Sequence, residues 1–255
     1  MKSHGMLFGL VGRKLGHSWS AELFNTKFSR EGINARYELF ELPDIDAFPS
    51  LIADHPELCG LNVTVPYKES VMRYLDSLTP EAEEVGAVNI IEFQREDSGF
   101  RLRGNNSDLY GFREAYRPLL PKGDGLALVL GTGGASKAAS AALRQLGKEV
   151  VFVSRHPSDE GMISYGEIDS ELMDDVQVIV NATPLGMWPK IDDAPAIPYS
   201  LLDSSKVCID LVYNPKETLF MKRCAARGAQ VANGETMLRL QAHRAWEIWM
   251  SCLPS

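Results

Sequence analysis

The chain has 255 residues, of which 45% are hydrophobic and 24% charged, and its formal net charge is -8. This composition is typical of a globular protein that is long enough for one large domain or two small ones. The negative net charge, together with the absence of any Lys/Arg run, argues against a nucleic-acid-binding surface.

The cysteines and the N-terminus suggest an intracellular protein without a structural metal. The four cysteines are scattered, with no C-x-x-C pair and no His at ligand spacing: Cys59, Cys208, Cys224 and Cys252. We therefore expect buried thiols in a reducing compartment rather than a zinc site or a disulfide framework. The apolar run after Met6 is interrupted by Gly9, Gly12 and Arg13, so it is too short for a signal peptide or a membrane span. These features predict a cytoplasmic location.

The first half of the chain predicts a mixed sheet. Strands are expected at "MLFGLVG", "ARYELFEL" and "CGLNVTV", with helices near 18–31, 44–54 and 67–77. The runs "AVNIIEF" and "FRLRGNN" follow, separated by the polar turn "QREDSG". This pair predicts a hairpin, which would add antiparallel strands to an otherwise parallel βα pattern.

The second half predicts a smaller doubly wound unit. Its apolar runs "LALVLG", "EVVFVS", "VQVIVNA" and "KVCIDLVY" alternate with helical patterns near 134–147, 169–174 and 217–227. A final helix is expected over 235–250, with Met237, Leu238, Ala245 and Ile248 on one stripe. The boundary between the halves should lie in the helix near 108–118 or in "RPLLPKGDG".

The stretch "VLGTGGASKAAS" has the features of a phosphate-binding turn. Gly131, Gly133 and Gly134 follow a predicted strand and open a predicted helix, the context that a dinucleotide fingerprint requires. Glycines let the backbone approach a pyrophosphate, and a helix N-terminus offers N–H groups and partial positive charge. Ser136 occupies the third fingerprint position, where Gly or Ala is usual, so a plain tight turn is the alternative.

The next predicted strand bears on the choice of dinucleotide. A carboxylate at its end would bind the ribose hydroxyls of NAD, whereas Ser154 and Arg155 suit the 2′-phosphate of NADP. Lys137 is a possible second cation. The alternative is that Arg155 is a solvated loop residue.

Two charged residues suggest a catalytic pair. Pro66 in "NVTVPYKES" suits the first position of a helix, which would place Lys68 in its first turn, where the helix dipole disfavours a cation. A cation there indicates a functional task or a carboxylate partner, although most lysines are simply solvated. Asp108 in "GNNSDLYG" is a candidate for that partner, and on its own it is only a favourable helix start.

Polar residues at two further places could bind a substrate. In "GHSWSAELF", Ser18 is expected to cap a helix, and Ser18 with Ser20 could bind a carboxylate, while His17 is expected to be structural. Gln241 lies on the apolar stripe of the last helix, where an amide needs a hydrogen-bonding partner. A hydroxylated ligand could be that partner.

Taken together and in this order, these residues resemble the shikimate dehydrogenase family. The resemblance covers almost the whole chain through eight stretches: "GLVGRKLGHSWS", "GLNVTVPYKES", "GAVNII", "GNNSDLYGF", "GTGGASKAA", "VNATPLGM", "IDLVYNPKETLF" and "NGETMLRLQA". It implies an α/β protein with an N-terminal mixed-sheet substrate domain and a Rossmann-type NADP-binding domain. The substrate domain would span 1–108 and be completed by the C-terminal helix 235–255, and the dinucleotide-binding domain would span 109–234.

The resemblance also implies an activity and a site. The activity would be the reversible NADPH-dependent reduction of 3-dehydroshikimate to shikimate, a step of the shikimate pathway of aromatic amino-acid (chorismate) biosynthesis, in a possible homodimer. Lys68 and Asp108 would be the catalytic pair. The substrate-binding residues would be Ser18, Ser20, Thr64, Asn89, Tyr213, Gln241 and Asp108 itself. The cofactor-binding residues would be Gly131, Thr132, Gly133, Gly134, Ala135, Ser154, Arg155, Thr183, Met187, Val212 and Gly234.

Three departures from the family pattern leave alternatives open. Ala21 replaces the usual proline, Ile90 replaces the usual threonine, and "SRHPSDEG" lacks the family's second basic residue. The last departure leaves the strength of the NADP preference open.

Two alternative functions stay open. One alternative is a quinate/shikimate dehydrogenase that also uses NAD. Another is a catalytically idle dinucleotide-binding regulator on the same fold, which the presence of Lys68, Asp108 and Gln241 argues against.

Overall fold

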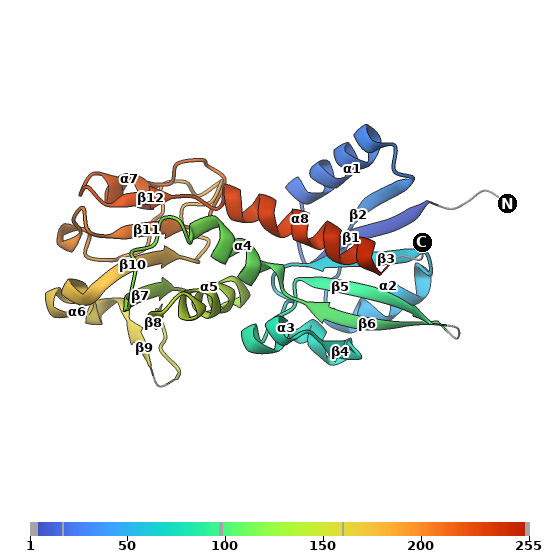
Figure 1. The fold of residues 1–255 in the computed structure, drawn as a ribbon, viewed down its shortest axis with the longest axis horizontal. Coiled ribbons are helices and arrows are strands. Elements are labelled where there is room, and N and C mark those ends of the chain that lie inside the picture. Colours follow the sequence, from blue (N-terminus) through green and yellow to red (C-terminus); the bar gives the residue numbers. More distant parts are fainter. Residues whose placement is uncertain (1–4, 17, 97–98, 160, 253–255) are drawn as a thin grey trace. The chain divides into compact units, whose positions relative to one another are not determined.

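The computed structural model describes residues 5–16, 18–96, 99–159 and 161–252. It separates the chain into two compact units, each with a sheet of its own (Figure 1). The first unit consists of Met1–Ser107 and Ala242–Ser255, and the second unit consists of Asp108–Gln241. The last helix, α8 (Glu235–Ser251), therefore contributes residues to both units.

The first unit contains a mixed sheet with the strand order β2-β1-β3-β5-β6-β4 in its described part. Its strands are β1 (Met6–Gly12), β2 (Ala35–Glu41), β3 (Leu58–Val63), β4 (Ser77–Leu78), β5 (Ile90–Glu96) and β6 (Gly99–Asn105). Its helical segments are α1 (Trp19–Glu31), η1 (Ile45–Ala47), α2 (Phe48–Asp54), η2 (Ser70–Tyr74) and α3 (Pro80–Val85). Strand β1 is parallel to β2 and β3, whereas β5 is antiparallel to β3 and β6. The predicted mixed sheet and hairpin are confirmed.

One face of this sheet is covered by aromatic side chains from both ends of the chain. Phe8 of β1 stacks on Trp249 of α8 with ring centroids 4.9 Å apart, and Phe24 of α1 lies 5.4 Å from the same ring. Trp249 is fully buried, and its Nε1 donates to Ile91 O at 3.2 Å. A Cβ at Gly60 would approach the Trp249 ring to 2.3 Å, so only glycine leaves room for the indole. The C-terminal part of α8 is therefore part of the core of the first unit.

The second unit contains a sheet in which all described pairings are parallel, in the order β12-β11-β10-β7-β8-β9. Its strands are β7 (Gly125–Leu130), β8 (Lys148–Ser154), β9 (Met162–Ser164), β10 (Val176–Asn181), β11 (Val207–Asp210) and β12 (Gln230–Ala232). Its helical segments are α4 (Ser107–Tyr116), α5 (Gly134–Gln145), η3 (Tyr165–Glu167), α6 (Ser170–Asp175), η4 (Tyr199–Leu201), α7 (Leu219–Ala225) and the start of α8. This is the doubly wound Rossmann order, so the predicted fold class is confirmed.

The strand order also locates the ligand-binding edge of the second unit. The chain reverses its direction of sheet growth between β7 and β10, which are neighbours. In doubly wound sheets, ligands bind beyond the carboxyl ends of the strands at this switch point. The loops after β7 and β10 are therefore the expected ligand-binding loops.

Several short elements were not predicted from the sequence. They include β4, α3, β9 and β12, each six residues or shorter. The stretch before and after α3 nevertheless contains recognisable end signals. The Thr79 side chain accepts from Ala82 N at 3.3 Å, Pro80 occupies the first turn, and Gly86 ends the helix at φ 65°.

The cysteines are free thiols in the structure. Cys59, Cys208 and Cys224 are buried as expected, whereas Cys252 is only half-buried. Among the described residues, no helix is both long enough and apolar enough to span a bilayer.

Candidate active site

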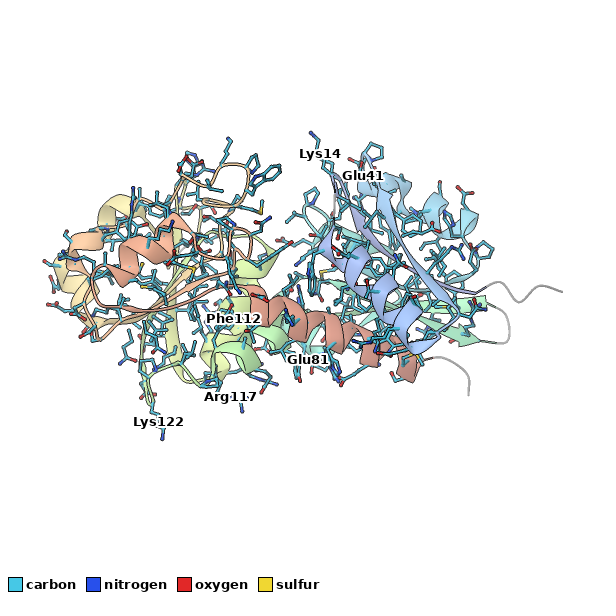
Figure 2. The ribbon with its side chains drawn as sticks, turned by 90° about the horizontal axis from the view of Figure 1, so that it is seen from above. Lys14, Glu41, Glu81, Phe112, Arg117 and Lys122 are labelled. Atoms are coloured by element: carbon cyan, nitrogen blue, oxygen red, sulfur yellow. The ribbon has the colours of Figure 1, made fainter. Side chains whose placement is uncertain are left out.

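The loop before α1 is held by a carboxylate of the neighbouring strand. Glu41, at the end of β2, accepts from Leu15 N at 2.7 Å and from Gly16 N at 3.4 Å. Figure 2 shows Glu41 beside Lys14 of this loop. Ser18 then caps α1 as predicted, accepting from Ser20 N at 3.3 Å. Both predicted carboxylate-binding hydroxyls thus belong to half-buried residues at a helix N-terminus, while His17 lies outside the described residues.

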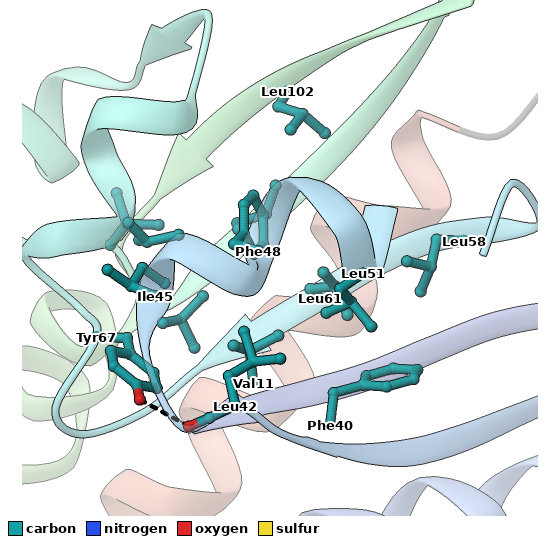
Figure 3. Close-up of a cluster of buried hydrophobic side chains, with 14 of the residues drawn as sticks. Val11, Phe40, Leu42, Ile45, Phe48, Leu51, Leu58, Leu61, Tyr67 and Leu102 are labelled. Atoms are coloured by element: carbon teal, nitrogen blue, oxygen red, sulfur yellow. Dashed lines mark hydrogen bonds between the residues drawn. The ribbon is translucent and has the colours of Figure 1, made fainter. Parts of the chain in front are cut away.

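The turn that contains Lys68 is anchored by its neighbour. Tyr67 is buried among the apolar side chains of the first unit, and its hydroxyl donates to Leu42 O at 2.7 Å (Figure 3). The carbonyl of Lys68 itself accepts from Val88 N at 2.7 Å. The first bond anchors the side chain of the preceding residue and the second anchors the carbonyl of Lys68, which is half-buried, so the Lys68 side chain starts from a defined position.

The prediction that Lys68 lies in the first turn of a helix over 67–77 is wrong. The regular segment is the short 3₁₀ helix η2, and it begins only at Ser70. The physical reason is that the Lys68 carbonyl is bonded to Val88 N and is therefore not part of a helical ladder. The unfavourable helix dipole is accordingly not an argument for the function of Lys68.

Thr64 and Asn89 lie at the ends of neighbouring strands in the first unit. A Cβ at Gly12 would come within 2.7 Å of Thr64 Cγ2, so the β1 backbone passes directly beside this side chain. Asn89 is buried, and its amide bonds Ser107 twice: Oδ1 accepts from Ser107 N at 2.8 Å and Nδ2 donates to Ser107 Oγ at 3.1 Å. Asn89 is therefore held against Ser107, the first residue of α4. Its contact with a substrate stays a prediction.

Asp108 and Gln241 lie on two closely packed helices of the second unit. Asp108 is 2% exposed and occupies the first turn of α4. A Cβ at Gly111 would approach Met237 O to 3.0 Å and Gln241 Cβ to 3.3 Å, so α4 and α8 meet at this glycine. Gln241 is half-buried. Of the predicted apolar stripe of α8, Met237 is buried in this unit, in agreement with the sequence.

The stripe continues in the part of α8 that belongs to the first unit. In this part Ala245 is fully buried and Ile248 is half-buried. Leu238, in the part that belongs to the second unit, is half-buried too. Of the four predicted stripe residues, Met237 and Ala245 are therefore buried, and Leu238 and Ile248 are half-buried.

The glycine loop after β7 has the geometry of an anion-binding turn. Gly131 has φ 105°, a conformation that favours glycine, and its missing Cβ would meet Ser136 Oγ and Thr183 Cγ2, each at 3.2 Å. Gly133 is exposed, and a Cβ built on it would meet nothing within 4 Å. It is the N-cap of α5, a helix of 12 residues, and no side chain caps that end. The N-terminus of α5 therefore has no side-chain cap and lies beside an unfilled Cβ position, an arrangement that fits a pyrophosphate.

Ser136, the departure from the glycine fingerprint, is fully buried in the first turn of α5. Among the residues that the structure describes, its hydroxyl finds no hydrogen-bonding partner. Thr132 of the loop is exposed, Gly134 is buried and Ala135 is half-buried. The predicted loop residues thus form one continuous turn from strand to helix.

The end of β8 positions the predicted 2′-phosphate contacts. Ser154 is half-buried, and its Oγ accepts from His156 N at 3.1 Å, which bends the chain immediately after the strand. Arg155 is exposed at this bend. No acidic residue stands at the end of β8 in place of these two, a composition that fits a 2′-phosphate better than free ribose hydroxyls.

The predicted nicotinamide-side residues come from three loops: Thr183 and Met187 follow β10, Val212 follows β11, and Gly234 lies between β12 and α8. Thr183 is half-buried and Met187 is 45% exposed. Tyr213, which was predicted to lie near the substrate carboxylate, follows Val212 and is 41% exposed. Val212 is buried, and its carbonyl accepts from Gly234 N at 3.2 Å. A Cβ at Gly234 would lie 2.2 Å from Leu211 O, so only glycine permits this approach. The structure brings these residues together at the same sheet edge as the glycine loop.

Sequence reasoning missed two buried polar residues beneath this edge, Asn181 and Asp210. They end the neighbouring strands β10 and β11 and are paired in the sheet register. Asn181 Nδ2 donates to Asp210 Oδ1 at 3.0 Å. Burial raises the pKa of the Asp210 carboxyl to about 6, and the hydrogen bonds it accepts partly offset that rise. The sequence did contain a signal for both residues, because each is a polar residue at the end of an apolar run: Asn181 in "VIVNA" and Asp210 in "CIDLV".

Comparisons with known proteins agree with this arrangement. Residues 10–91 match the family model described as shikimate dehydrogenase substrate binding domain. A shikimate dehydrogenase (NADP(+)) of Clostridium beijerinckii is 39% identical, and the match covers 96% of this chain and 92% of the relative. A second one, from Chlorobaculum tepidum, is 36% identical over 95% of this chain and 90% of its own.

Solved structures are similar over the same range. The shikimate 5-dehydrogenase of Thermus thermophilus in complex with NADP(H) and shikimate superposes with a TM-score of 0.83 at 31% identity, covering 98% of this chain and 95% of that one. The match in sequence and in fold thus extends over both units. The chain belongs to the shikimate dehydrogenase family.

Proposed function

We propose that this chain catalyses the reversible, NADPH-dependent reduction of 3-dehydroshikimate to shikimate. The observation on which this depends is the match to NADP(+)-dependent relatives at up to 39% identity over nearly the whole chain. A solved relative at 31% identity is described with NADP(H) and shikimate bound. The chain is accordingly an oxidoreductase that acts on a CH–OH group.

The proposed substrate side belongs to the first unit. Ser18 and Ser20, at the N-terminus of α1, would bind the substrate carboxylate, because hydroxyls and helix N–H groups both favour an anion. Thr64 and Asn89 would hydrogen-bond the ring hydroxyls, together with Asp108 and Gln241 of the second unit. Tyr213 would lie near the carboxylate.

The proposed proton transfer depends on Lys68 and Asp108. Reduction of the ring ketone builds negative charge on the carbonyl oxygen, and an ammonium group directed at that oxygen stabilises the charge and can donate a proton. The anchored turn around Lys68 supports this role, because it limits where the side chain can reach. Asp108 would orient the ammonium, and we assign the acid–base role to the pair.

The proposed cofactor side belongs to the second unit. The N-terminus of α5 and the glycine loop would hold the pyrophosphate, while Ser154 and Arg155 would contact the 2′-phosphate. Thr183, Met187, Val212 and Gly234 would border the nicotinamide. When bound, NADPH supplies the hydride for the reduction.

The direct test is a spectrophotometric assay with shikimate and NADP as substrates. We expect reduction of NADP that requires shikimate. The same assay with quinate and with NAD tests the alternative of a quinate/shikimate dehydrogenase, and comparable kcat/KM values for those pairs would support it. The homodimer and the cytoplasmic location expected from the sequence stay predictions.

A further inference from the structure

A buried carboxylate lies beneath the nicotinamide-side loops without any assigned role. Asp210 has no exposed surface and accepts three hydrogen bonds. Its Oδ1 accepts from Asn181 Nδ2 at 3.0 Å and from Val212 N at 3.0 Å, and its Oδ2 accepts from Thr218 Oγ1 at 2.5 Å. One side chain thus connects the end of β10, the loop after β11 and the N-cap of α7.

The connection continues through Asn181 into the loop after β10. Asn181 Oδ1 accepts from both the amide and the hydroxyl of Thr183, at 3.1 and 2.6 Å. Asn181 Nδ2 is also 3.3 Å from Leu185 O. The side chain of Thr183 is therefore oriented by Asn181, and Asn181 is oriented in turn by Asp210.

These bonds define the backbone of two ligand-binding loops. The loop after β10 contains Thr183 and Met187, and the loop after β11 contains Val212 and Tyr213. Trp188 N donates to Asn214 O at 3.0 Å, which joins the two loops further out. By contrast, none of the described bonds of Asp210 reaches the glycine loop after β7.

We propose that Asp210 is a positioning residue that holds the nicotinamide half of the site in place, acting through Asn181 and Val212. This inference rests on the proposed function, because it concerns how the bound nicotinamide is oriented for hydride transfer. A buried carboxylate is costly for stability unless it is fully hydrogen-bonded. The three groups that donate hydrogen bonds to Asp210 belong to the end of β10, to the loop after β11 and to the N-cap of α7. Hydride transfer requires the nicotinamide ring to be held within a fraction of an ångström, and this requirement would explain why a buried carboxylate is present at this position.

The test compares Asp210→Ala with Asp210→Asn in the whole protein. We expect kcat for shikimate oxidation to fall roughly 10- to 100-fold in Asp210→Ala, because small displacements of reacting groups have effects of this size. Asp210→Asn keeps the Oδ1 acceptor for Asn181 and Val212, so it should recover most of the lost kcat.

Ligand binding separates positioning from general damage. Adenosine 2′,5′-bisphosphate contains the adenosine half of NADP and lacks the nicotinamide. Its affinity should change by less than about twofold in Asp210→Ala, since none of the described bonds of Asp210 reaches Ser154 or Arg155, while the affinity for NADPH falls clearly more. Cys208→Ala, on the same strand and fully buried, is the matched control for lost packing and should show no such selectivity.

Three results would overturn the inference: unchanged kcat in Asp210→Ala, equal losses of NADPH and adenosine 2′,5′-bisphosphate affinity, or the same kinetic loss in Cys208→Ala. If Asp210→Ala does not fold, Asn181→Ala must show the selective loss instead, because it breaks the same path to Thr183. A wild-type protein that does not oxidise shikimate would refute the proposed function. The difference between the two binding measurements would still decide the role of Asp210.

Discussion

The two units offer different kinds of atoms to a ligand. In the first unit, the candidate groups are side chains whose backbones are fixed by buried bonds, such as Lys68 between Tyr67 and Val88. In the second unit, the glycine loop offers main-chain N–H groups and an unfilled Cβ position at Gly133. Side chains distinguish one ring hydroxyl from another, whereas main-chain groups suit a pyrophosphate that is the same in every dinucleotide. Substitutions in the first unit should therefore alter chemistry, and substitutions in the glycine loop should alter cofactor affinity.

The largest effect is expected at Lys68 of the first unit. Lys68→Ala should lower kcat by roughly 10²- to 10⁴-fold, the usual contribution of a positioned acid–base group. KM should change much less, because the lost interaction belongs to the transition state. Steady-state kinetics measures both, with Lys122→Ala, at an exposed lysine of the second unit (Figure 2), as the control. Near-normal turnover in Lys68→Ala would remove Lys68 from the mechanism.

In the second unit, Arg155 is one of the side chains that depart from this main-chain rule. Arg155→Ala should weaken binding of NADPH by roughly 1.5–3 kcal/mol, the value of a hydrogen bond to a charged group. Binding of NADH, which lacks the 2′-phosphate, should change little. Titration with both cofactors is the measurement, and equal losses would show that Arg155 only supports its loop.

Gly133 and Gly131 test the main-chain site itself. Gly133→Ala should leave thermal stability unchanged, because its φ is -80° and its Cβ would meet no protein atom. If a phosphate occupies that space, NADPH affinity should fall roughly tenfold, since an oxygen-to-N–H contact of about 1.4 kcal/mol is lost. Gly131→Ala should instead lower the melting temperature, because its φ is 105° and Thr183 Cγ2 lies 3.2 Å away. A stable Gly133→Ala variant with full NADPH affinity would contradict the proposed pyrophosphate position.

Gln241 belongs to the second unit, but its predicted contact is a side-chain contact to the substrate, as in the first unit. Gln241→Leu should weaken shikimate binding by about 0.5–1.5 kcal/mol, the net value of one hydrogen bond, and leave NADPH affinity unchanged. Calorimetric titration with each ligand separately is the test. Unaltered shikimate affinity, or a collapse in thermal stability, would show a structural amide and would transfer its role to Asn89 and Asp108.

The smallest effect concerns pH and the buried Asp210. Its pKa in the folded state is about 6, above the ordinary value of 3.8, so the folded state binds this proton more tightly than the unfolded state does. The stability of the wild type should therefore rise as pH falls through 6. Relative to Asp210→Asn, the gain between about pH 7 and pH 5 should be about 1 kcal/mol in the free energy of unfolding. Urea unfolding at both pH values measures it, and a constant difference would contradict the raised pKa.

The sequence predicted most regular elements, because apolar periodicity reports directly on burial. It located both sheets and the hairpin between β5 and β6. It did not predict that Lys68 leaves the helical ladder, because that depends on a bond to Val88, 20 positions along the chain. Asp210 was missed for a related reason: its partners Asn181 and Thr218 come together only when the parallel strands align. Local pattern therefore supplied the candidate site residues that lie next to a turn, whereas contacts such as these depend on tertiary structure.

The position of Trp249 has a consequence for biosynthesis. The indole fills the space above Gly60 and contacts Phe8 and Phe24, yet it lies more than 180 residues after Gly60 in the chain. While the ribosome is still translating the second unit, the first unit has no ring to place there, and Phe8 and Phe24 lack one of their aromatic partners. We expect the first unit to complete its core only after residues 242–251 have left the exit tunnel. Nascent chains stalled before that point should then be more sensitive to protease in the first unit than released chains are.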